Sequence, residues 1–209
     1  FNITAKGVIS DSIDASFYRS ISSGRDFRSE LGIPQSSLVV AFVGRLIPEK
    51  GINSIIEAAR TKDITKRDIC FVLAGDGPLA NEVKEACSSN LFWLGRCNTE
   101  DISSLLQQAD VLCLPTRSEG FSTVLLEASA CGTPAVVTDV GGARELILDD
   151  SYGTIIRSMA SDEVVSALCR LFDDRELLSL QSRNSRALVE SRYNWDATAM
   201  DVEKAFCIC

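Results

Sequence analysis

Short segments that are apolar throughout alternate along this chain with segments of helical periodicity. The clearest pair is the run Leu38-Val39-Val40-Ala41-Phe42-Val43, followed by a segment over 51–59 in which Ile52, Ile55 and Ile56 fall on one helical face. Strands that are apolar at every position are typical of a parallel sheet buried on both faces. The pattern therefore predicts an α/β fold, with a parallel sheet of about six strands and helices on both faces.

The same alternation continues to the end of the chain. It predicts strands at 38–43, 69–74, 91–94, 111–114, 134–138 and 152–156. It predicts helices at 51–59, 78–87, 100–109, 122–131, 162–172, 175–191 and 195–206. Pro78 suits the first position of its helix, and Thr99 is expected to cap the next one. The first 36 residues are polar and rich in turns, so we expect them to form a linker or lead-in.

Five loops follow the carboxyl ends of the predicted strands. In open parallel sheets this is the edge at which ligands bind. The loops are 44–51, 75–78, 95–98, 115–121 and 139–142. We therefore expect the functional residues to gather in these five segments.

The composition excludes several kinds of chemistry. The chain has no histidine, so Ser-His-Asp, Cys-His and His-metal sites cannot be built from its residues. Its net charge of −8 argues against nucleic-acid binding. The eight cysteines form no Cys-x-x-Cys pair, and Cys207-Ile208-Cys209 resembles no metal site, so we expect reduced thiols and a cytoplasmic location. No apolar run approaches the ~18 residues of a membrane span, and no signal peptide is recognisable.

Two carboxylates eight positions apart, Glu119 and Glu127, lie in the loop and the helix that follow the strand at 111–114. The N-terminus of this helix, near Ser122, offers unpaired N–H groups and a positive dipole end that suit a phosphate. Glu127 is flanked by leucines and alanines, and a carboxylate in such surroundings needs a partner. A sugar diol with two O–H donors would be such a partner. The alternative interpretation is purely structural, with Glu119 as a loop carboxylate and Glu127 in a salt bridge on the helix.

Two cations, Arg45 and Lys50, lie in the loop after the first strand, beside Gly44 and Gly51. Glycine lets a ligand approach the backbone, and both cations would bind phosphate oxygens. By spacing alone, a solvated turn with surface charges is the favoured interpretation. The segment 75–80 loosely fits a dinucleotide-binding pattern, but it follows the second strand, and a tight turn before a helix also explains it.

Taken together, these segments resemble the C-terminal, donor-binding domain of retaining glycosyltransferases with the GT-B fold, of the glycosyl transferases group 1 or family 4 type. The matching motifs are Val43-Gly44-Arg45 with Glu49-Lys50-Gly51, Ala74-Gly75-Asp76-Gly77-Pro78, Phe92-Trp93-Leu94-Gly95, Ala109-Asp110-Val111, Glu119-Gly120-Phe121 through Glu127-Ala128, and Cys131-Gly132-Thr133-Pro134 through Gly142. Their order and spacing agree from about Val39 to Glu145. The lead-in at 8–14 resembles the family's interdomain strand and loop, with the usual Pro-Asn-Gly replaced. The resemblance implies a Rossmann-like sheet that forms one half of a GT-B fold.

The resemblance also implies a role for each matching residue. Arg45 and Lys50 would hold the donor's diphosphate, and Glu119 would contact the transferred sugar and stabilise its oxocarbenium-like transition state, which makes these three the predicted catalytic residues. Glu127 would bind the ribose hydroxyls. The other predicted nucleotide-sugar-binding residues are Gly44, then Arg96 and Cys97 against the base, then Gly120, Phe121 and Ser122 through their backbone N–H groups. Asp139, Gly141 and Gly142 would shape the floor of the pocket.

The resemblance further implies the chain's partners. A UDP-type or GDP-type nucleotide sugar would be the donor substrate, with no cofactor and no metal ion. We expect residues 1–36 to be an interdomain lead-in, 37–192 the nucleotide-sugar-binding domain, and 193–209 a helix that crosses toward a missing N-terminal acceptor-binding domain. Any membrane contact would be made through that other domain, and this chain alone is expected to be inactive without it.

The predicted function is therefore the nucleotide-sugar-binding half of a retaining, metal-independent hexosyltransferase that acts on a glycan, lipid or small-molecule acceptor. Two alternatives stay open. One is a nucleotide-binding module without catalysis. The other is a dinucleotide-dependent oxidoreductase, for which the segment 75–80 is the only motivation.

Overall fold

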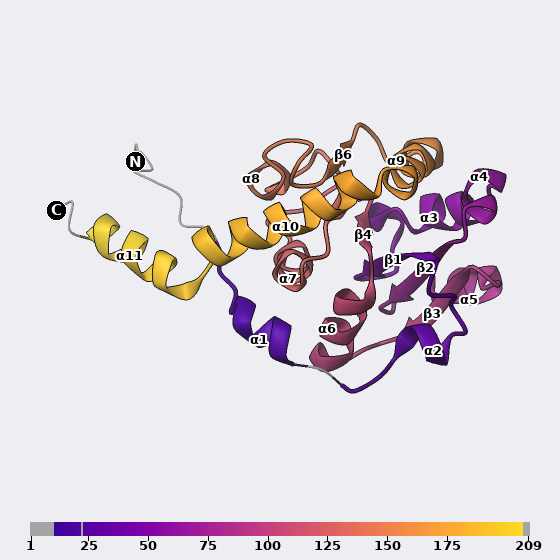
Figure 1. Ribbon diagram of the computed structural model, residues 1–209, viewed down its shortest axis with the longest axis horizontal. Helices are drawn as coiled ribbons and strands as arrows, with labels where there is room; N and C mark the ends of the chain where they lie inside the picture. Colours follow the sequence, from indigo (N-terminus) through magenta and orange to yellow (C-terminus); the bar gives the residue numbers. More distant parts are fainter. Residues whose placement is uncertain (1–10, 22, 207–209) are drawn as a thin grey trace.

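The computed structural model describes residues 11–21 and 23–206. It contains one sheet of six parallel strands in the order β3-β2-β1-β4-β5-β6 (Figure 1). The strands are β1 (Leu38–Val43), β2 (Ile69–Ala74), β3 (Leu91–Gly95), β4 (Val111–Leu114), β5 (Ala135–Thr138) and β6 (Thr154–Ile156). The predicted α/β class and the parallel sheet are thus confirmed. The strand order reverses between β1 and β4, and that is the position at which open parallel sheets bind ligands.

Helices cover both faces of the sheet, as predicted. One group is formed by α3 (Ile52–Ala59), α4 (Lys62–Lys66), α5 (Ala80–Ala86) and α9 (Ser161–Asp173). The other is formed by α1 (Ala15–Ser20), α2 (Phe27–Glu30), α6 (Thr99–Gln108), α7 (Thr123–Cys131) and α10 (Arg175–Arg192). All residues of β1, β2, β4 and β5 are buried between the two layers. This double burial explains why these strands are apolar at every position.

Several short elements escaped the sequence pattern. They are α1, α2, α4, α8 (Ala143–Leu146) and the 3₁₀ helix η1 (Pro48–Lys50). The first 36 residues are therefore more than a linker, because both α1 and α2 begin there. Asp14 caps α1 by accepting from the backbone N–H of Phe17, and Asp26 caps α2 by accepting from that of Ser29. Helices of four to six residues are too short to display a periodicity, so only their caps mark them.

Two predicted helix starts are wrong. The predicted cap Thr99 is the first residue of α6, and the cap is Asn98, whose side chain accepts from the N–H of Asp101 at 2.8 Å. Pro78 lies in the turn before α5, which begins at Ala80 rather than at the proline. The lead-in residues 8–10 and the Cys207–Cys209 segment lie outside the described residues.

The final helix, α11 (Trp195–Phe206), continues beyond the end of α10 and lies away from the sheet (Figure 1). Its Trp195 is 63% exposed and its Met200 54% exposed. At the corner between α10 and α11, the N–H of Ile13 donates to the carbonyl of Tyr193 at 2.8 Å. None of the helices in residues 11–206 is both long and apolar enough to span a bilayer.

Candidate active site

The loops after β1 and β4 are joined directly at the point where the strand order reverses. The backbone N–H of Arg117 donates to the carbonyl of Glu49 at 2.7 Å, and the Thr116 hydroxyl donates to the same carbonyl at 3.0 Å. Gly51 has a φ of +73°, and a Cβ at this position would overlap the carbonyl oxygen of Pro115. Glycine at 51 therefore permits the close contact that brings the two loops together.

This contact brings together two of the predicted catalytic residues. Lys50 at the end of η1 and Glu119 in the loop after β4 form an ion pair, although they are 69 positions apart. Their side chains are 22% and 23% exposed, so the pair is accessible from solvent but mostly enclosed. A cation and a carboxylate thus lie side by side between the ends of β1 and β4.

The loop after β5 supports Glu119 from the other side. The N–H of Gly142 donates to the carbonyl of Gly120 at 2.9 Å. Gly141 has a φ of +54°, and a Cβ there would overlap backbone atoms of the Glu119 loop. The ring of Phe121 stacks on Tyr193 with centroids 5.8 Å apart, and this contact connects the loop that carries Glu119 to the end of α10. The predicted pocket floor at 139–142 therefore packs against the predicted sugar-binding loop.

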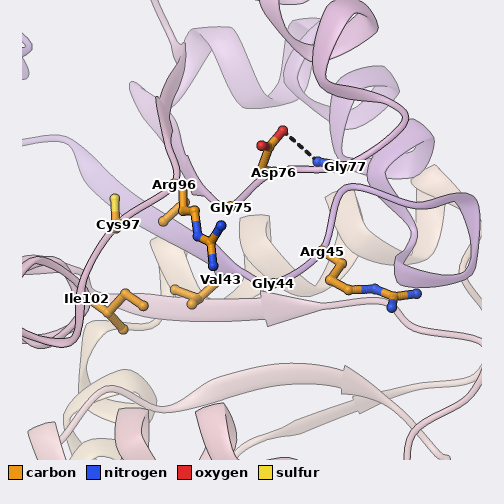
Figure 2. A pocket seen from close by; sticks show the side chains of 10 residues that line it. Val43, Gly44, Arg45, Gly75, Asp76, Gly77, Arg96, Cys97 and Ile102 are labelled. Carbon is orange, nitrogen blue, oxygen red and sulfur yellow. Dashed lines mark hydrogen bonds between the residues drawn. The ribbon is translucent and has the colours of Figure 1, made fainter.

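A cleft of about 620 Å³ lies at the ends of β1, β2 and β3 (Figure 2). Glycines bring its walls together, because a Cβ at Gly75 would overlap the Gly44 carbonyl oxygen and one at Gly77 would come within 2.6 Å of the Leu46 carbonyl oxygen. Four predicted site residues line it: Gly44, Arg45, Arg96 and Cys97. The remaining lining residues are Val43, Ala74, Gly75, Asp76, Gly77 and Ile102.

The charges of this cleft favour an anionic or electron-rich ligand. Arg45 and Arg96 are both exposed, and neither forms an ion pair with any residue in the described part of the chain. The carboxylate of Asp76 is occupied by its own turn, where it accepts from the N–H of Gly77 at 2.7 Å. Figure 2 shows the Arg45 side chain extending away from Arg96, so the two guanidinium groups lie apart.

The start of α7 presents a further feature that suits an anion. Ser122 is its N-cap residue, but the Ser122 side chain makes no capping hydrogen bond. The N–H groups of the first turn therefore receive no acceptor from their own N-cap side chain, and they lie where the helix dipole is positive. Glu119, Gly120 and Ser122 line a small cavity together with residues of β5 and α8.

Glu127, the second predicted carboxylate, lies apart from this ion pair and from the lining of the large cleft. It is on α7, where its Oε1 accepts a hydrogen bond from the hydroxyl of Tyr18 at 2.9 Å. Burial raises the pKa of Glu127, and the bond from Tyr18 partly offsets that rise. Burial together with the charge of Glu127 also raises the pKa of the Tyr18 hydroxyl.

The expectation that Glu127 needs a partner is thus met within the chain by Tyr18. The two residues are 109 positions apart, and no spacing pattern in the sequence connects them. The predicted roles of Glu127 and of the other site residues stay predictions. Within residues 11–21 and 23–206, no group of three or more His, Cys, Asp or Glu residues is arranged to hold a metal ion.

The fold is similar to that of solved glycosyltransferases. HepE from Anabaena, solved in complex with UDP, gives a TM-score of 0.82 at 23% sequence identity, over 97% of this chain and 57% of HepE. The C-terminal domain of LpcC, a glycosyl transferase group 1 family protein from Francisella tularensis, gives a TM-score of 0.74 at 24% identity, over 88% of this chain and 99% of that domain. The chain thus has the architecture of one half of a GT-B fold.

The curated proteins whose sequences are similar to this chain are also glycosyltransferases. The chain is 32% identical over 196 residues to the UDP-Gal:alpha-D-GlcNAc-diphosphoundecaprenol alpha-1,3-galactosyltransferase of Escherichia coli. The matched region covers 90% of this chain and 50% of that enzyme. It is 29% identical over 179 residues to the GDP-mannose-dependent monoacylated alpha-(1-6)-phosphatidylinositol monomannoside mannosyltransferase of Corynebacterium glutamicum, over 81% of this chain and 47% of that enzyme. The chain spans about half the length of the curated relatives it matches.

The family assignment rests on most of the chain rather than on one motif. Residues 24–188 match the family described as glycosyl transferases group 1. This range includes β1 to β6 and every loop that carries a predicted site residue. The chain therefore belongs to the glycosyl transferases group 1 family.

Proposed function

We propose that this chain binds a nucleoside-diphosphate sugar and forms the donor-binding half of a retaining hexosyltransferase. The observation that carries the proposal is the Lys50–Glu119 ion pair at the point where the strand order reverses, together with a cleft lined by two arginines that have no ionic partner among the described residues. A diphosphate needs cations, and a hexose offers hydroxyl groups that a carboxylate accepts. Both kinds of group are present at this one edge of the sheet.

The cleft at the ends of β1 to β3 is the proposed binding site for the nucleoside base. Its Val43, Ile102 and Cys97 provide apolar surface, while Arg96 and the backbone of the 95–98 loop provide hydrogen-bond donors. The ring carbonyls of uracil and guanine accept hydrogen bonds from such donors. These contacts support a UDP-type or GDP-type donor.

The diphosphate is proposed to bind between the loop after β1 and the start of α7. Arg45 has no ionic partner in the described residues and is free to donate to phosphate oxygens. The residues Gly120, Phe121 and Ser122, which lead into α7, would add their backbone N–H groups beside the positive end of the helix dipole. Charge that develops on the leaving phosphate would meet donors that are already in place, and such preorganised electrostatics is commonly the largest catalytic term.

Lys50 and Glu119 would exchange partners when the donor arrives. In the structure each neutralises the other. With donor bound, Lys50 would turn to the diphosphate and Glu119 would accept from a sugar hydroxyl, close to the carbon at which positive charge develops. The proposed mechanism needs no metal ion, since the cationic side chains and the helix N-terminus balance the phosphate charge.

The acceptor is proposed to bind to a separate N-terminal domain, because the chain spans about half of its relatives. Helix α11 supports this arrangement, since the helix lies away from the sheet (Figure 1) and its Trp195 and Met200 are exposed. Residues 193–209 would then cross toward that domain, with 1–36 as the connection to it and 37–192 as the donor-binding domain. Transfer of a hexose to a glycan, a lipid or a small molecule, at a cytoplasmic location, completes the proposal.

Calorimetry with UDP, GDP and ADP, each with and without Mg²⁺, tests this proposal. We expect one nucleoside diphosphate to bind without metal, and its sugar conjugates to bind at the same site. Absence of binding by all three would refute a preformed donor site. Binding of a nicotinamide dinucleotide alone would instead support the oxidoreductase alternative, and nucleotide binding without sugar transfer in the presence of an acceptor-binding half would support a non-catalytic module.

A further inference from the structure

Helix α1 lies beside α7, although 102 residues lie between the end of α1 and the start of α7 in the sequence (Figure 1). The contact places the Tyr18 hydroxyl 2.9 Å from Oε1 of Glu127. We infer that Tyr18 is a positioning residue for Glu127: it holds one carboxylate oxygen so that the other is presented to the ribose hydroxyls of the donor. This inference rests on the proposed function and adds to it a residue from outside the matching motifs.

Tyr18 is held from both ends, which is what a positioning role requires. Its backbone carbonyl accepts from the Ser103 hydroxyl at 2.9 Å and from Nε2 of Gln107 at 2.8 Å, both on α6. Its ring contacts Phe17 edge to face, with centroids 5.4 Å apart. The hydroxyl therefore approaches Glu127 from a backbone that is itself anchored, so the carboxylate is oriented before any ligand binds.

Among the described residues, Glu127 forms no ion pair, and Tyr18 is its hydrogen-bond partner. The charged groups on the helices that pack against α7 have other partners: Arg19 of α1 pairs with Glu190 of α10 at 3.0 Å, and Arg186 of α10 donates to the backbone carbonyl of Cys131 at 2.6 Å. On α6, Asp101 pairs with Arg25 at 3.6 Å. The nearby Cys131 thiol stays neutral near pH 7, because burial raises its pKa to about 11.

The protonation state of Glu127 links this contact to binding. The carboxylate form accepts hydrogen bonds from ribose hydroxyls more strongly than the protonated acid, which has less acceptor capacity and no charge. Burial raises the pKa of Glu127, and the Tyr18 hydrogen bond opposes that rise. Removal of the Tyr18 hydroxyl should therefore raise the pKa further, so that the carboxylate is lost at a higher pH.

The substitution Tyr18→Phe tests the inference, because it removes the hydroxyl and keeps the ring. The probes are the nucleoside diphosphate that binds best, UDP or GDP, and its 2′,3′-dideoxy analogue. In Y18F we expect affinity for the ribonucleotide to fall about threefold to tenfold at pH 7.5, the range of one hydrogen bond, with the dideoxy analogue unchanged. As the pH is lowered from 7.5 to 5.5, the affinity for the ribonucleotide divided by that for the dideoxy analogue should fall more steeply in Y18F than in the unaltered chain. The titration of the phosphate groups affects both nucleotides equally and cancels in this ratio.

Tyr152→Phe is the matched control, because Tyr152 lies in the turn before β6, away from the α1–α7 contact. It should leave both affinities unchanged. A second readout needs no ligand: a ¹³C titration of glutamate carboxyl carbons, with E127Q to assign the signal, should give a higher pKa for Glu127 in Y18F than in the unaltered chain.

Three results would overturn the inference in different ways. Equal loss of both nucleotides in Y18F, with the Glu127 pKa unchanged, would reduce Tyr18 to a packing role. Tighter ribonucleotide binding in Y18F would mean that the tyrosine blocks the site. If the unaltered chain binds the nucleotide and its dideoxy analogue equally well, the ribose role of Glu127 is refuted but a donor site is still supported. If the unaltered chain binds neither nucleotide, the proposed function itself is refuted.

Discussion

The two carboxylates of the β4–α7 region, Glu119 and Glu127, are eight positions apart and lie in different environments. Glu119 is on a loop and is paired with a charged partner, Lys50. Glu127 is one turn inside a helix and is bonded to a neutral donor, Tyr18. Ligand binding can displace a partly exposed ion pair at small cost, because such pairs contribute little net stability. Glu119 can therefore exchange its partner when a ligand binds, whereas Glu127 is a partly buried acceptor that Tyr18 holds in place.

The largest expected effect is that of Glu119→Ala on turnover. In a protein that includes an acceptor-binding half, we expect kcat to fall about 10²–10³-fold, since one preorganised electrostatic contact to the transition state is lost. Nucleotide affinity should stay the same or increase slightly, because Lys50 is then free for the phosphates. Release of the nucleoside diphosphate gives the rate, and calorimetry gives the affinity. Equal losses in both quantities would show that Glu119 only binds.

The partner substitution, Lys50→Ala, should act on the nucleotide instead. We expect affinity for the nucleoside diphosphate to fall about 10–50-fold at low salt, the range of a charge-assisted contact to phosphate, and the difference should shrink as salt is added. Lys62→Ala is the control, because Lys62 is an exposed lysine on α4. An unchanged affinity in K50A would remove Lys50 from the site.

For the second carboxylate, Glu127→Ala should weaken ribonucleotide binding about tenfold, since the diol loses its acceptor. Affinity for the 2′,3′-dideoxy analogue should be unaffected. In the unaltered chain the raised pKa of Glu127 predicts that ribonucleotide affinity decreases as pH falls toward that pKa, relative to the dideoxy analogue. A variant that binds both nucleotides as well as the unaltered chain would remove the ribose assignment.

The smallest expected effect is on stability. In the folded chain the pKa of Glu127 lies above its value in the unfolded chain, so its ionisation destabilises the folded state at neutral pH. Glu127→Gln removes the charge and still accepts from Tyr18, so Tm should rise by about 1–3 °C at pH 7.5. That gain should disappear as pH falls below the ordinary value of 4.5. Calorimetric melts at several pH values test this, and a gain that grows toward low pH would contradict it.

The sequence predicts the sheet well and the site in part, for physical reasons. Strands such as β1 and β2 are buried on both faces, so their apolar runs are distinctive. The placement of Lys50 and Glu119 at one edge of the sheet follows from parallel strands whose carboxyl ends share that edge, whereas their ion pair was not predicted. The Tyr18–Glu127 bond does not follow, because α1 is a six-residue helix marked only by its Asp14 cap, and its position on α7 is set by tertiary contacts alone.

Chemical-shift mapping of the backbone amides during a titration with UDP or GDP tests the central claim most directly. If the reversal of strand order between β1 and β4 is the donor site, the largest shifts should fall in 44–51, 95–98 and 119–127, and Lys50→Ala should reduce them at a given nucleotide concentration. Saturable shifts confined to other surfaces, such as α9 or the α10–α11 corner, would contradict the claim.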